Sequence, residues 1–316
     1  MPVKINRHMQ QSPEWTEFKK SLGKTIISNH GSGWLYNAYI ERGDGRFGKY
    51  FKRLYCPYGP AATNNSAFKE SLDSLTSYAV NHDIDFVRIE LTSNQDFANI
   101  AKTNGFSKAS RLSQPDLTLN IDLSQETDSI LGAMSKTNQY LWRKAPDNNL
   151  SFKISYMPSA LDPIGVMITQ TAQRASAIFH PLEYYKTLLK VLGPSKTAGV
   201  AYAYHNNEVV VGAIFFDDKQ ESTRYYLYGY SKDSARKLSA NSPLLTYLIL
   251  DAKSNGLKTF DMFGVSPADQ PNHRWAGFSK FKRSFGGYEL AYGGTWEKPI
   301  KQVRYSALKF ARKISK

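Results

Sequence analysis

Apolar and polar residues follow one another in the first third of the chain in a pattern that predicts strands around one helix. Residues 35–41 and 50–60 are rich in aromatic and branched side chains and are expected to pair as strands, with an Asp-Gly hairpin tip within residues 43–48. Apolar residues at helical spacing predict a helix over residues 66–84. The alternation in residues 85–92 then predicts a further strand.

A second round of the same kind begins near Asp128. A helix is expected over residues 126–145, ended by Pro146, and a strand over residues 150–157. The remaining expected elements are helices at 163–178 and 181–193, strands at 197–206, 208–218 and 222–231, a helix at 242–256 and a strand at 257–265. Each half runs strand hairpin, helix, strand, which predicts two similar α/β units that pack closely.

Length and charge narrow the class of protein. A chain of 316 residues suits two domains, and its net charge of +14 favours a polyanion or an anionic membrane surface as partner. The one cysteine, Cys56, excludes an internal disulfide framework. The N-terminal residues lack the apolar core of a signal peptide, and the apolar run at 209–216 is too short to span a bilayer. We therefore expect a cytoplasmic protein.

Several common motifs fail on their context. Gly43, Gly45 and Gly48 have the spacing of a dinucleotide fingerprint, but they lie between two expected strands instead of opening a helix. The GKT at Gly23 has Phe18 where a phosphate-binding loop needs its first glycine. DMFG at Asp261 is not a kinase DFG, and the six histidines lie too far apart to predict a metal site. No metal or nucleotide cofactor is expected.

The segment GFSKFKRSFGGYELAYGG, residues 277–294, places basic residues between aromatic ones. Lys280, Lys282 and Arg283 alternate with Phe281 and Phe285 before a Gly-Gly pair. A basic, solvated strand edge that discourages aggregation would explain this pattern without any function. Binding of an anionic group is the alternative.

Several segments in order resemble the Fem family of aminoacyl-tRNA-dependent peptidyltransferases. They are SPEWTEFK, YCPYGPA, DFVRIE, LTLNIDLSQETDSILGAMSKTNQYLWRKA, HPLEYY, RYYLYGYS, TFDMFGVSP and GFSKFKRSFGG. The resemblance implies an α/β fold of two tandem domains similar to N-acetyltransferases (GNAT-like). We expect a first domain at 1–127, completed by a C-terminal helix at 298–316, and a second at 128–297. No sustained heptads are present, so no coiled-coil arm is expected.

The resemblance also implies a reaction and a site. Fem enzymes transfer an amino acid from aminoacyl-tRNA to the stem peptide of a peptidoglycan precursor, and their Phe-Lys pair matches Phe281 and Lys282. A fixed cation in a dry cleft stabilises the oxyanion that forms when an amine attacks an ester. We therefore expect Lys282 to face the reacting carbonyl with Phe281 beside it. Lys280 and Arg283 are expected to contact RNA phosphates.

Further positions carry over as contacts to the acceptor precursor. Tyr226 and Tyr228 match paired family tyrosines, and at spacing two they are expected to share one face of a strand. Tyr184 matches a family tyrosine that contacts the precursor. His180 stands where the family has an arginine, which is a natural phosphate ligand, so this departure leaves open the contacts to a diphosphate or the identity of the acceptor. A capping or surface histidine is the alternative.

The other site residues carried over lie nearer the N-terminus and on the expected helix before Pro146. Lys19 matches a lysine that contacts the precursor, and Glu90 stands where some members have an aspartate that could orient the amine. A solvated strand end is the alternative for Glu90, and Trp15 is expected in the core. Arg143 and Lys144 are candidates for tRNA or membrane phosphates, or else they form an exposed helix face.

Two other functions stay open. A coenzyme-A-dependent N-acyltransferase of the same fold class would need a glycine-containing loop to hold pyrophosphate, and KDSARKLSANSP at residues 232–243 has no glycine. A non-catalytic RNA- or membrane-binding protein is the second alternative. In the segment 301–316, Val303, Ala307, Phe310 and Ile314 fall on one helical face, which is expected to dock on a domain. We expect a monomer; the amino acid transferred and the form of the acceptor are left open.

Overall fold

The chain leaves its first structural unit near residue 117 and returns to it near residue 291. The computed structural model describes residues 4–42, 48–92, 96–110, 112–175 and 179–314. Unit 1 comprises Met1–Asp116 together with Ala291–Lys316, and unit 2 comprises Leu117–Leu290. The expected hairpin tip falls largely on residues 43–47, which lie outside the described residues.

Both junctions between the units lie earlier in the chain than expected. Strand β7 (Leu117–Asp122) pairs with β12 (Thr259–Gly264), so the second unit begins before residue 128. Strand β14 (Gly294–Pro299) pairs with β5 (Phe86–Leu91), so the chain has returned to unit 1 before residue 298. Sheet pairing, which no short sequence window reports, sets these boundaries.

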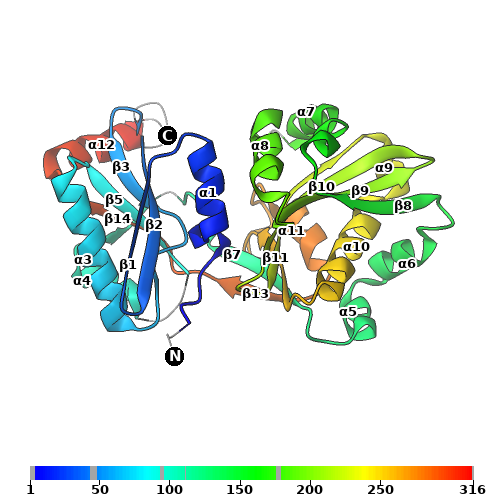
Figure 1. Ribbon diagram of the computed structural model, residues 1–316, viewed down its shortest axis with the longest axis horizontal. Coiled ribbons are helices and arrows are strands. Elements are labelled where there is room, and N and C mark those ends of the chain that lie inside the picture. Colours follow the sequence, from blue (N-terminus) through cyan, green and yellow to red (C-terminus); the bar gives the residue numbers. More distant parts are fainter. Residues whose placement is uncertain (1–3, 43–47, 93–95, 111, 176–178, 315–316) are drawn as a thin grey trace. The chain divides into compact units, whose positions relative to one another are not determined.

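Unit 1 is built on a seven-stranded sheet with the order β1-β2-β3-β5-β14-β6, and β4 pairs with β2 (Figure 1). Its other elements are η1 (Met9–Gln11), α1 (Pro13–Ser21), β1 (Ile26–Gly31), β2 (Trp34–Arg42), β3 (Lys52–Cys56), β4 (Ala61–Ala62), α3 (Asn65–Asn81), α4 (Phe97–Thr103), β6 (Ser107–Lys108) and α12 (Gln302–Ile314). The expected hairpin is confirmed, because β2 and β3 pair antiparallel.

Strand β5 shows how the two faces of this sheet differ. Val87 and Ile89 pack into the hydrophobic core formed with α3 and α4. Because side chains alternate along a strand, Arg88 and Glu90 point to the opposite face. There Arg88 lies across from Glu297 and Glu90 lies across from Thr295 on β14.

Helix α12 attaches to that second face of unit 1. Tyr305 and Leu308 are buried against Phe86, and the Tyr305 hydroxyl donates to Glu297 Oε2 at 2.7 Å. Arg312 Nη1 approaches the same oxygen at 3.0 Å. Burial alone would raise the pKa of Glu297, but these groups and Arg88 hold it below its ordinary value. The expected return of a C-terminal helix to the first domain is confirmed.

Unit 2 contains a second seven-stranded sheet with the order β13-β7-β12-β11-β10-β9-β8. Its other elements are α5 (Thr127–Ala133), α6 (Lys136–Lys144), β8 (Leu150–Ser155), η2 (Pro158–Leu161), α7 (Ile164–Ala175), α8 (Leu182–Leu192), β9 (Ala198–His205), β10 (Glu208–Asp218), β11 (Thr223–Ser231), α9 (Ser234–Leu238), α10 (Asn241–Ser254), α11 (Ala276–Arg283) and β13 (Tyr288–Ala291). The three expected central strands pair as antiparallel neighbours.

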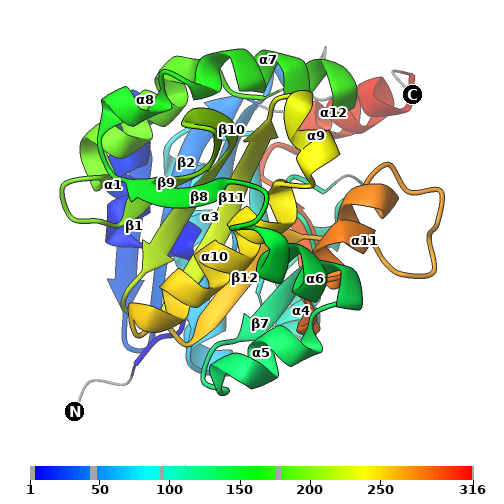
Figure 2. The same cartoon turned by 90° about the vertical axis from the view of Figure 1, so that its right-hand side faces the viewer.

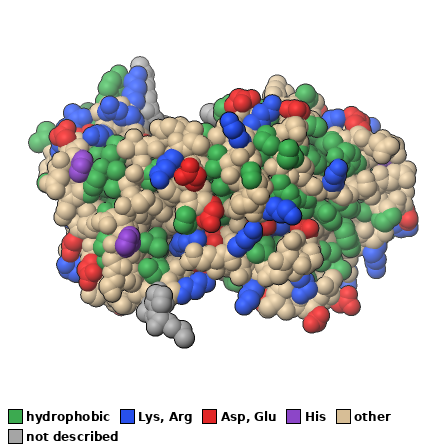
Figure 3. All heavy atoms as spheres, in the orientation of Figure 1, with side chains coloured by type: hydrophobic (Ala, Val, Ile, Leu, Met, Phe, Trp, Pro, Cys, Tyr) green, Lys and Arg blue, Asp and Glu red, His purple; other side chains and the backbone are tan. Residues whose placement is uncertain are grey.

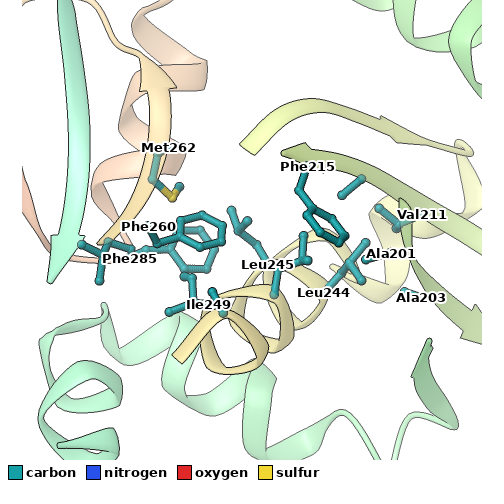
Figure 4. Packing of buried hydrophobic residues seen from close by; sticks show 14 of the residues in the cluster. Ala201, Ala203, Val211, Phe215, Leu244, Leu245, Ile249, Phe260, Met262 and Phe285 are labelled. Atoms are coloured by element: carbon teal, nitrogen blue, oxygen red, sulfur yellow. The ribbon is translucent and has the colours of Figure 1, made fainter. Parts of the chain in front are cut away.

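Helices cover both faces of this sheet, with α7 and α8 on one side and α10 on the other (Figures 1 and 2). Val211 and Ala213 of β10 belong to the core with α10, whereas a side chain at Gly212 would meet Ile164 of α7. Figure 4 shows Leu245 and Ile249 of α10 beside the rings of Phe260, on β12, and Phe285, which follows α11. The expectation of a two-unit α/β fold is confirmed, and the described residues contain no long coiled-coil arm.

Two helices differ from expectation. The helix predicted over residues 126–145 is two helices, α5 and α6, because the Ser135 side chain accepts from Asn138 N and caps a new helix. The basic segment considered as a strand edge is the helix α11. Its aromatic and basic residues alternate in sequence, but a helix of 3.6 residues per turn sends them in several directions.

Candidate functional site

Lys282 lies on α11, which the chain holds firmly against the segment that follows β12. The Ser279 hydroxyl oxygen accepts hydrogen bonds from Ser266 N at 2.8 Å and from Ser266 Oγ at 3.0 Å. At the other end of the helix, Asn138 Nδ2 donates to Ser284 O at 3.0 Å and so ties α6 to α11. These contacts fix the position of the helix that carries Lys282. No pattern in the sequence indicated this role for Asn138.

The Lys282 side chain is buried, with 2% of its surface exposed. Its Nζ donates to Gly264 O at 2.8 Å and lies 4.0 Å from the centre of the Phe278 ring. Phe278 therefore contacts the cation; Phe281, the expected neighbour, packs against the core and stands edge-on to Phe285 at 5.2 Å. An ammonium group in this position has one backbone acceptor and retains further N–H donors.

The negative charge of Asp261 favours the protonated form of Lys282 and so raises its pKa. Its Oδ1 accepts from the Thr118 hydroxyl and from Phe263 N, the latter at 2.7 Å. The pairing of β12 with β7 shifts between Asp261 and Gly264, and Phe263 has a φ of 61°. This irregular turn of the strand brings the Gly264 carbonyl into contact with the lysine and places the Asp261 carboxylate near enough to act on its charge.

Burial dominates the ionisation of this pair. It lowers the pKa of Lys282 to about 7, even though Asp261 favours the charged lysine. It also raises the pKa of Asp261 to about 6, against hydrogen bonds from Thr118 and Phe263 and against the charge of Lys282. A lysine that titrates near neutral pH in a desolvated position is typical of functional sites.

The remaining basic residues of α11 divide into two kinds. Lys280 is exposed and available to a phosphate group. Arg283 is already engaged, because its Nε donates to Glu289 Oε1 at 2.6 Å and its Nη2 to Ser266 O at 2.6 Å. Arg283 therefore holds α11 to its surroundings, and its expected contact with RNA phosphates competes with these bonds.

An aromatic cluster forms between α8 and β11 in the same unit. The His180 ring stacks on Tyr184 with centres 3.8 Å apart, and Tyr185 meets Tyr228 edge-on at 5.0 Å. Tyr228 also lies parallel to Tyr230 at 6.5 Å. Burial raises the pKa of both Tyr184 and Tyr228, so both hydroxyls stay protonated, and the two hydroxyls interact with each other through a hydrogen bond. Three expected site residues thus lie together here.

Tyr226 does not join this cluster, contrary to the expectation that Tyr226 and Tyr228 share a face. The register of β10 and β11 shifts between Ile214, which pairs with Tyr228, and Phe215, which pairs with Tyr226. The intervening Leu227 is an extra residue, and a bulge of this kind cancels the period-two alternation. Tyr226 accordingly packs against the core on the α10 side.

Glu90 of unit 1 is buried, so its interpretation as a solvated strand end is wrong. Only 3% of its surface is exposed, because it points to the face of β5 away from the α3 core. Its Oε2 accepts from the Tyr55 hydroxyl at 2.9 Å, and Tyr58 N approaches at 3.4 Å. Burial raises the pKa of Glu90 to about 7 despite these hydrogen bonds.

A shallow recess in unit 1 opens beside this carboxylate. It is lined by Tyr58, Glu90, Leu91, Gln114, Pro115, Asp116, Tyr292, Gly294 and Thr295. His8 stacks on Tyr58 with ring centres 3.8 Å apart, and burial lowers its pKa to about 3, so it is a neutral packing group. The recess has no room for a water molecule, and the Tyr58 hydroxyl already donates to Pro115 O at 2.9 Å, so a ligand would reach Glu90 only if this part of unit 1 rearranged.

The other predicted residues are less enclosed. Lys19 is half-buried, with its Nζ 5.8 Å from the Trp15 ring centre and 5.6 Å from that of Tyr39, and burial lowers its pKa. Trp15 is buried in the core, as expected. Arg143 and Lys144 are exposed at the end of α6, where Lys144 pairs with Asp147 at 2.9 Å.

Two kinds of feature are absent from the part of the chain that the structure describes. No group of three or more histidine, cysteine, aspartate or glutamate side chains among them is arranged to hold a metal ion. None of the helices they form is both long and apolar enough to cross a membrane.

Comparisons with known proteins bear on the family. Residues 195–313 match the model of the FemAB family, a range that includes Tyr226, Tyr228, Asp261 and Lys282. The crystal structure of FemX matches with a TM-score of 0.82 at 16% identity, covering 96% of this chain and 95% of that one. The resemblance to the Fem family is therefore confirmed. No curated protein sequence gives a significant match.

Other solved structures share the fold at lower similarity. One is the C-terminal domain of a protein described as a lysylphosphatidylglycerol synthetase, from Agrobacterium fabrum, with a TM-score of 0.62, 12% identity and coverage of 95% and 91%. Another is a tandem GNAT protein from the clavulanic acid biosynthesis pathway, with a TM-score of 0.53, 11% identity and coverage of 87% and 83%. The tandem GNAT-like architecture is thus shared by proteins that are described with different activities.

Proposed function

We propose that this FemAB-family chain is an aminoacyltransferase that moves an amino acid from aminoacyl-tRNA to an amino group on the stem peptide of a peptidoglycan precursor. The observation that carries the proposal is Lys282. It is a buried lysine with a pKa near 7, within the segment that matches the family, held between a backbone carbonyl and a cation–π contact.

The proposed reaction is aminolysis of an ester. The acceptor nitrogen attacks the carbonyl carbon, a C–N bond forms, and the carbonyl oxygen becomes an oxyanion. The C–O bond to the tRNA ribose then breaks, and the proton lost by the amine goes to the ribose oxygen. The ammonium of Lys282 stabilises the oxyanion, and a pre-positioned cation in a desolvated site needs little reorganisation to do so.

Asp261 has a supporting role in this proposal. Burial alone disfavours the charged form of Lys282, and the carboxylate of Asp261 partly offsets that effect. Because Asp261 is itself held by Thr118 and Phe263 N, it cannot swing away without losing both hydrogen bonds. The ester donor is already activated, so the proposal requires no metal ion or nucleotide cofactor.

The acceptor side of the proposal rests on two groups of residues. In unit 2, the proposal assigns acceptor binding to the aromatic surface formed by His180, Tyr184 and Tyr228, where the two hydroxyls form a hydrogen-bonded pair. In unit 1, the proposal assigns Lys19 and Glu90 to acceptor binding. Aminoacyl-tRNA is a cytoplasmic donor, so we propose that compartment for the reaction.

The competing function is that of a coenzyme-A-dependent acyltransferase. The likeness of the fold to that of a tandem GNAT protein is the reason to test it. Pyrophosphate is commonly held by free N–H groups of a glycine-rich loop at a helix start. The corresponding stretch here contains no glycine and forms the short helix α9. We therefore expect no transfer from acetyl-coenzyme A.

The experiment incubates the full chain with mixed charged tRNA and with either the nucleotide-linked or the lipid-linked precursor, and weighs the products by mass spectrometry. The proposal predicts a precursor heavier by one or more amino acid residues. Acetyl-coenzyme A as donor and phosphatidylglycerol as acceptor are the controls. If phosphatidylglycerol gained an amino acid and the precursor did not, the lipid would be the acceptor and the proposed acceptor would be wrong. If the precursor became acetylated, acetyl-coenzyme A would be the donor and the proposed donor would be wrong.

A further inference from the structure

Helix α12 has two apolar faces, and only one of them is used in unit 1. Tyr305 and Leu308 are buried against Phe86, and Arg312 reaches Glu297 from the same side of the helix. Of the predicted docking stripe, Val303, Ala307 and Phe310 are on the other side, so the expectation that they pack on the domain is wrong; the side chain of Ile314 lies outside the described part of the chain. Nothing that the structure describes covers this stripe.

The exposure of the stripe is unusual for this chain. Val303 is 84% exposed and Phe310 is 67% exposed, and no other large hydrophobic side chain among the described residues exceeds these values. Val303, Ala307 and Phe310 are spaced by four and three residues, which aligns them along one side of a helix. Tyr305 is two residues from Val303, which is about 200° around the helix axis. The stripe therefore points directly away from the core.

Positive charge borders the stripe. Helix α12 contains no aspartate or glutamate and includes four basic residues, Arg304, Lys309, Arg312 and Lys313, of which Arg312 turns toward Glu297 on the buried side. Lys309 is exposed, with its Nζ 5.5 Å from the Tyr305 ring centre, and Arg304 is half-exposed while it contacts Asp85. Figure 3 shows basic and hydrophobic side chains next to one another at the upper left, where Figure 1 places α12.

We propose that α12 docks unit 1 on an anionic lipid bilayer, with the stripe of Val303, Ala307 and Phe310 in the interfacial region and Lys309 beside it at the headgroups. A helix with an apolar stripe between basic flanks is the form that lies in the plane of such a surface. Long basic side chains extend their charged ends to the headgroup level while their stems remain apolar.

The charges argue against the other occupants of this surface. A second copy of the chain would bring the same basic flanks together across the stripe, and like charges at an interface repel. An RNA would be attracted to the lysines, but its phosphates gain nothing from Val303 and Phe310. Only a partner that is both anionic and apolar at its boundary satisfies the stripe and its flanks together.

This inference is independent of the transfer reaction, because it concerns a surface made by one helix of unit 1. If α12 docks as proposed, the enzyme is held at the membrane surface, where lipid-linked acceptors are found. A chain that binds vesicles but transfers nothing would leave the docking intact and refute the proposed function. An active enzyme that ignores vesicles would do the reverse.

The test measures flotation of the full chain with vesicles of phosphatidylglycerol and phosphatidylcholine, compared with vesicles of phosphatidylcholine alone. Wild-type protein should float with the anionic vesicles at low salt and much less with the neutral ones. The double variant Val303→Ser/Phe310→Ser should bind the anionic vesicles at least about tenfold more weakly, since it loses the buried apolar area. Lys309→Gln should weaken binding and reduce its dependence on salt.

The matched control is Met157→Ser/Val166→Ser, which removes two similarly exposed apolar side chains from unit 2. It should float like the wild type, and circular dichroism should show both double variants folded. Equal flotation of the two double variants would overturn the proposal. A loss of tRNA binding in Val303→Ser/Phe310→Ser, or its conversion from dimer to monomer, would assign the stripe to RNA or to a second copy instead.

Discussion

At the scale of single residues, the central feature is a lysine whose charge the protein regulates by burial. The sequence and the family resemblance identify Lys282, but its neighbours could not be read from the pattern. Phe278, four residues earlier on α11, contacts the ammonium, whereas Phe281 points into the core. The counter-charge, Asp261, comes from a strand 21 residues away and becomes a neighbour only through the fold.

The pH dependence of turnover follows from these two groups. The lysine stabilises an oxyanion only when protonated, and its pKa is lowered to about 7. Protonated lysine predominates below that value, so turnover should fall as the pH rises through about 7. Asp261→Asn removes a charge that favours the ammonium and should move this descending limb to lower pH. A descending limb unchanged by Asp261→Asn in kcat–pH profiles would contradict this account.

The two tyrosines of β11 provide a second test at this scale. Tyr228 lies in the aromatic cluster with Tyr185, whereas the bulge turns Tyr226 toward the core. Tyr228→Phe removes the hydroxyl of a half-buried ring that the proposal assigns to acceptor binding, and it should raise the acceptor KM about fivefold to tenfold, the effect of one hydrogen bond. Tyr226→Phe should leave it nearly unchanged. Equal effects on the two KM values would mean that both rings reach the acceptor.

At the scale of elements, periodicity predicted most helices and strands because their apolar residues are spaced for burial. It failed where a local feature broke the period. Ser135 restarts the helix between α5 and α6, and Leu227 is an extra residue in β11. For α12 the helix was predicted but the wrong stripe was assigned to the interface. The buried face contributes only two apolar residues to the pattern, Tyr305 and Leu308. The exposed face contributes Val303, Ala307 and Phe310, so the apolar pattern alone favoured the exposed face.

The two faces of α12 predict unequal effects on stability. Leu308 is fully buried, so Leu308→Ala should lower the free energy of unfolding by about 2–5 kcal/mol, as buried leucine truncations do. Phe310→Ala truncates a larger but exposed side chain and should change the free energy of unfolding by less than about 0.5 kcal/mol. Urea denaturation followed by fluorescence measures both. A larger loss from Phe310→Ala would mean that the exposed stripe packs on the protein.

At the scale of the whole molecule, the net charge of +14 is the property that bears most on partners. Composition alone predicted an anionic partner, but it could not separate tRNA from a membrane surface. The structure distributes this charge over exposed groups such as Lys280 and Arg143 and engaged groups such as Arg283. Only exposed basic groups can neutralise a phosphate and so release the counterions condensed on a nucleic acid.

Binding of tRNA should therefore weaken steeply with salt. Each phosphate neutralised releases condensed counterions, so the logarithm of the binding constant should fall linearly with the logarithm of salt concentration. Lys280→Gln should reduce the slope by about one, and Arg283→Gln should reduce it less, because Arg283 is bound to Glu289. A flat titration from 50 to 200 mM salt, a range of about fourfold over which phosphate-driven binding drops strongly, would exclude phosphate contacts as the basis of binding.

The most direct measurement of the central claim compares kcat for Lys282→Met and Lys280→Met in the transfer assay. Methionine keeps much of the volume of lysine and removes its charge, so folding can be checked separately by circular dichroism. Loss of a group that stabilises the oxyanion should lower kcat by about 100-fold to 1000-fold in Lys282→Met, with little change in acceptor binding. Lys280→Met should alter kcat little. Equal and mild effects of the two substitutions in folded proteins would contradict the assignment of Lys282 to the reaction.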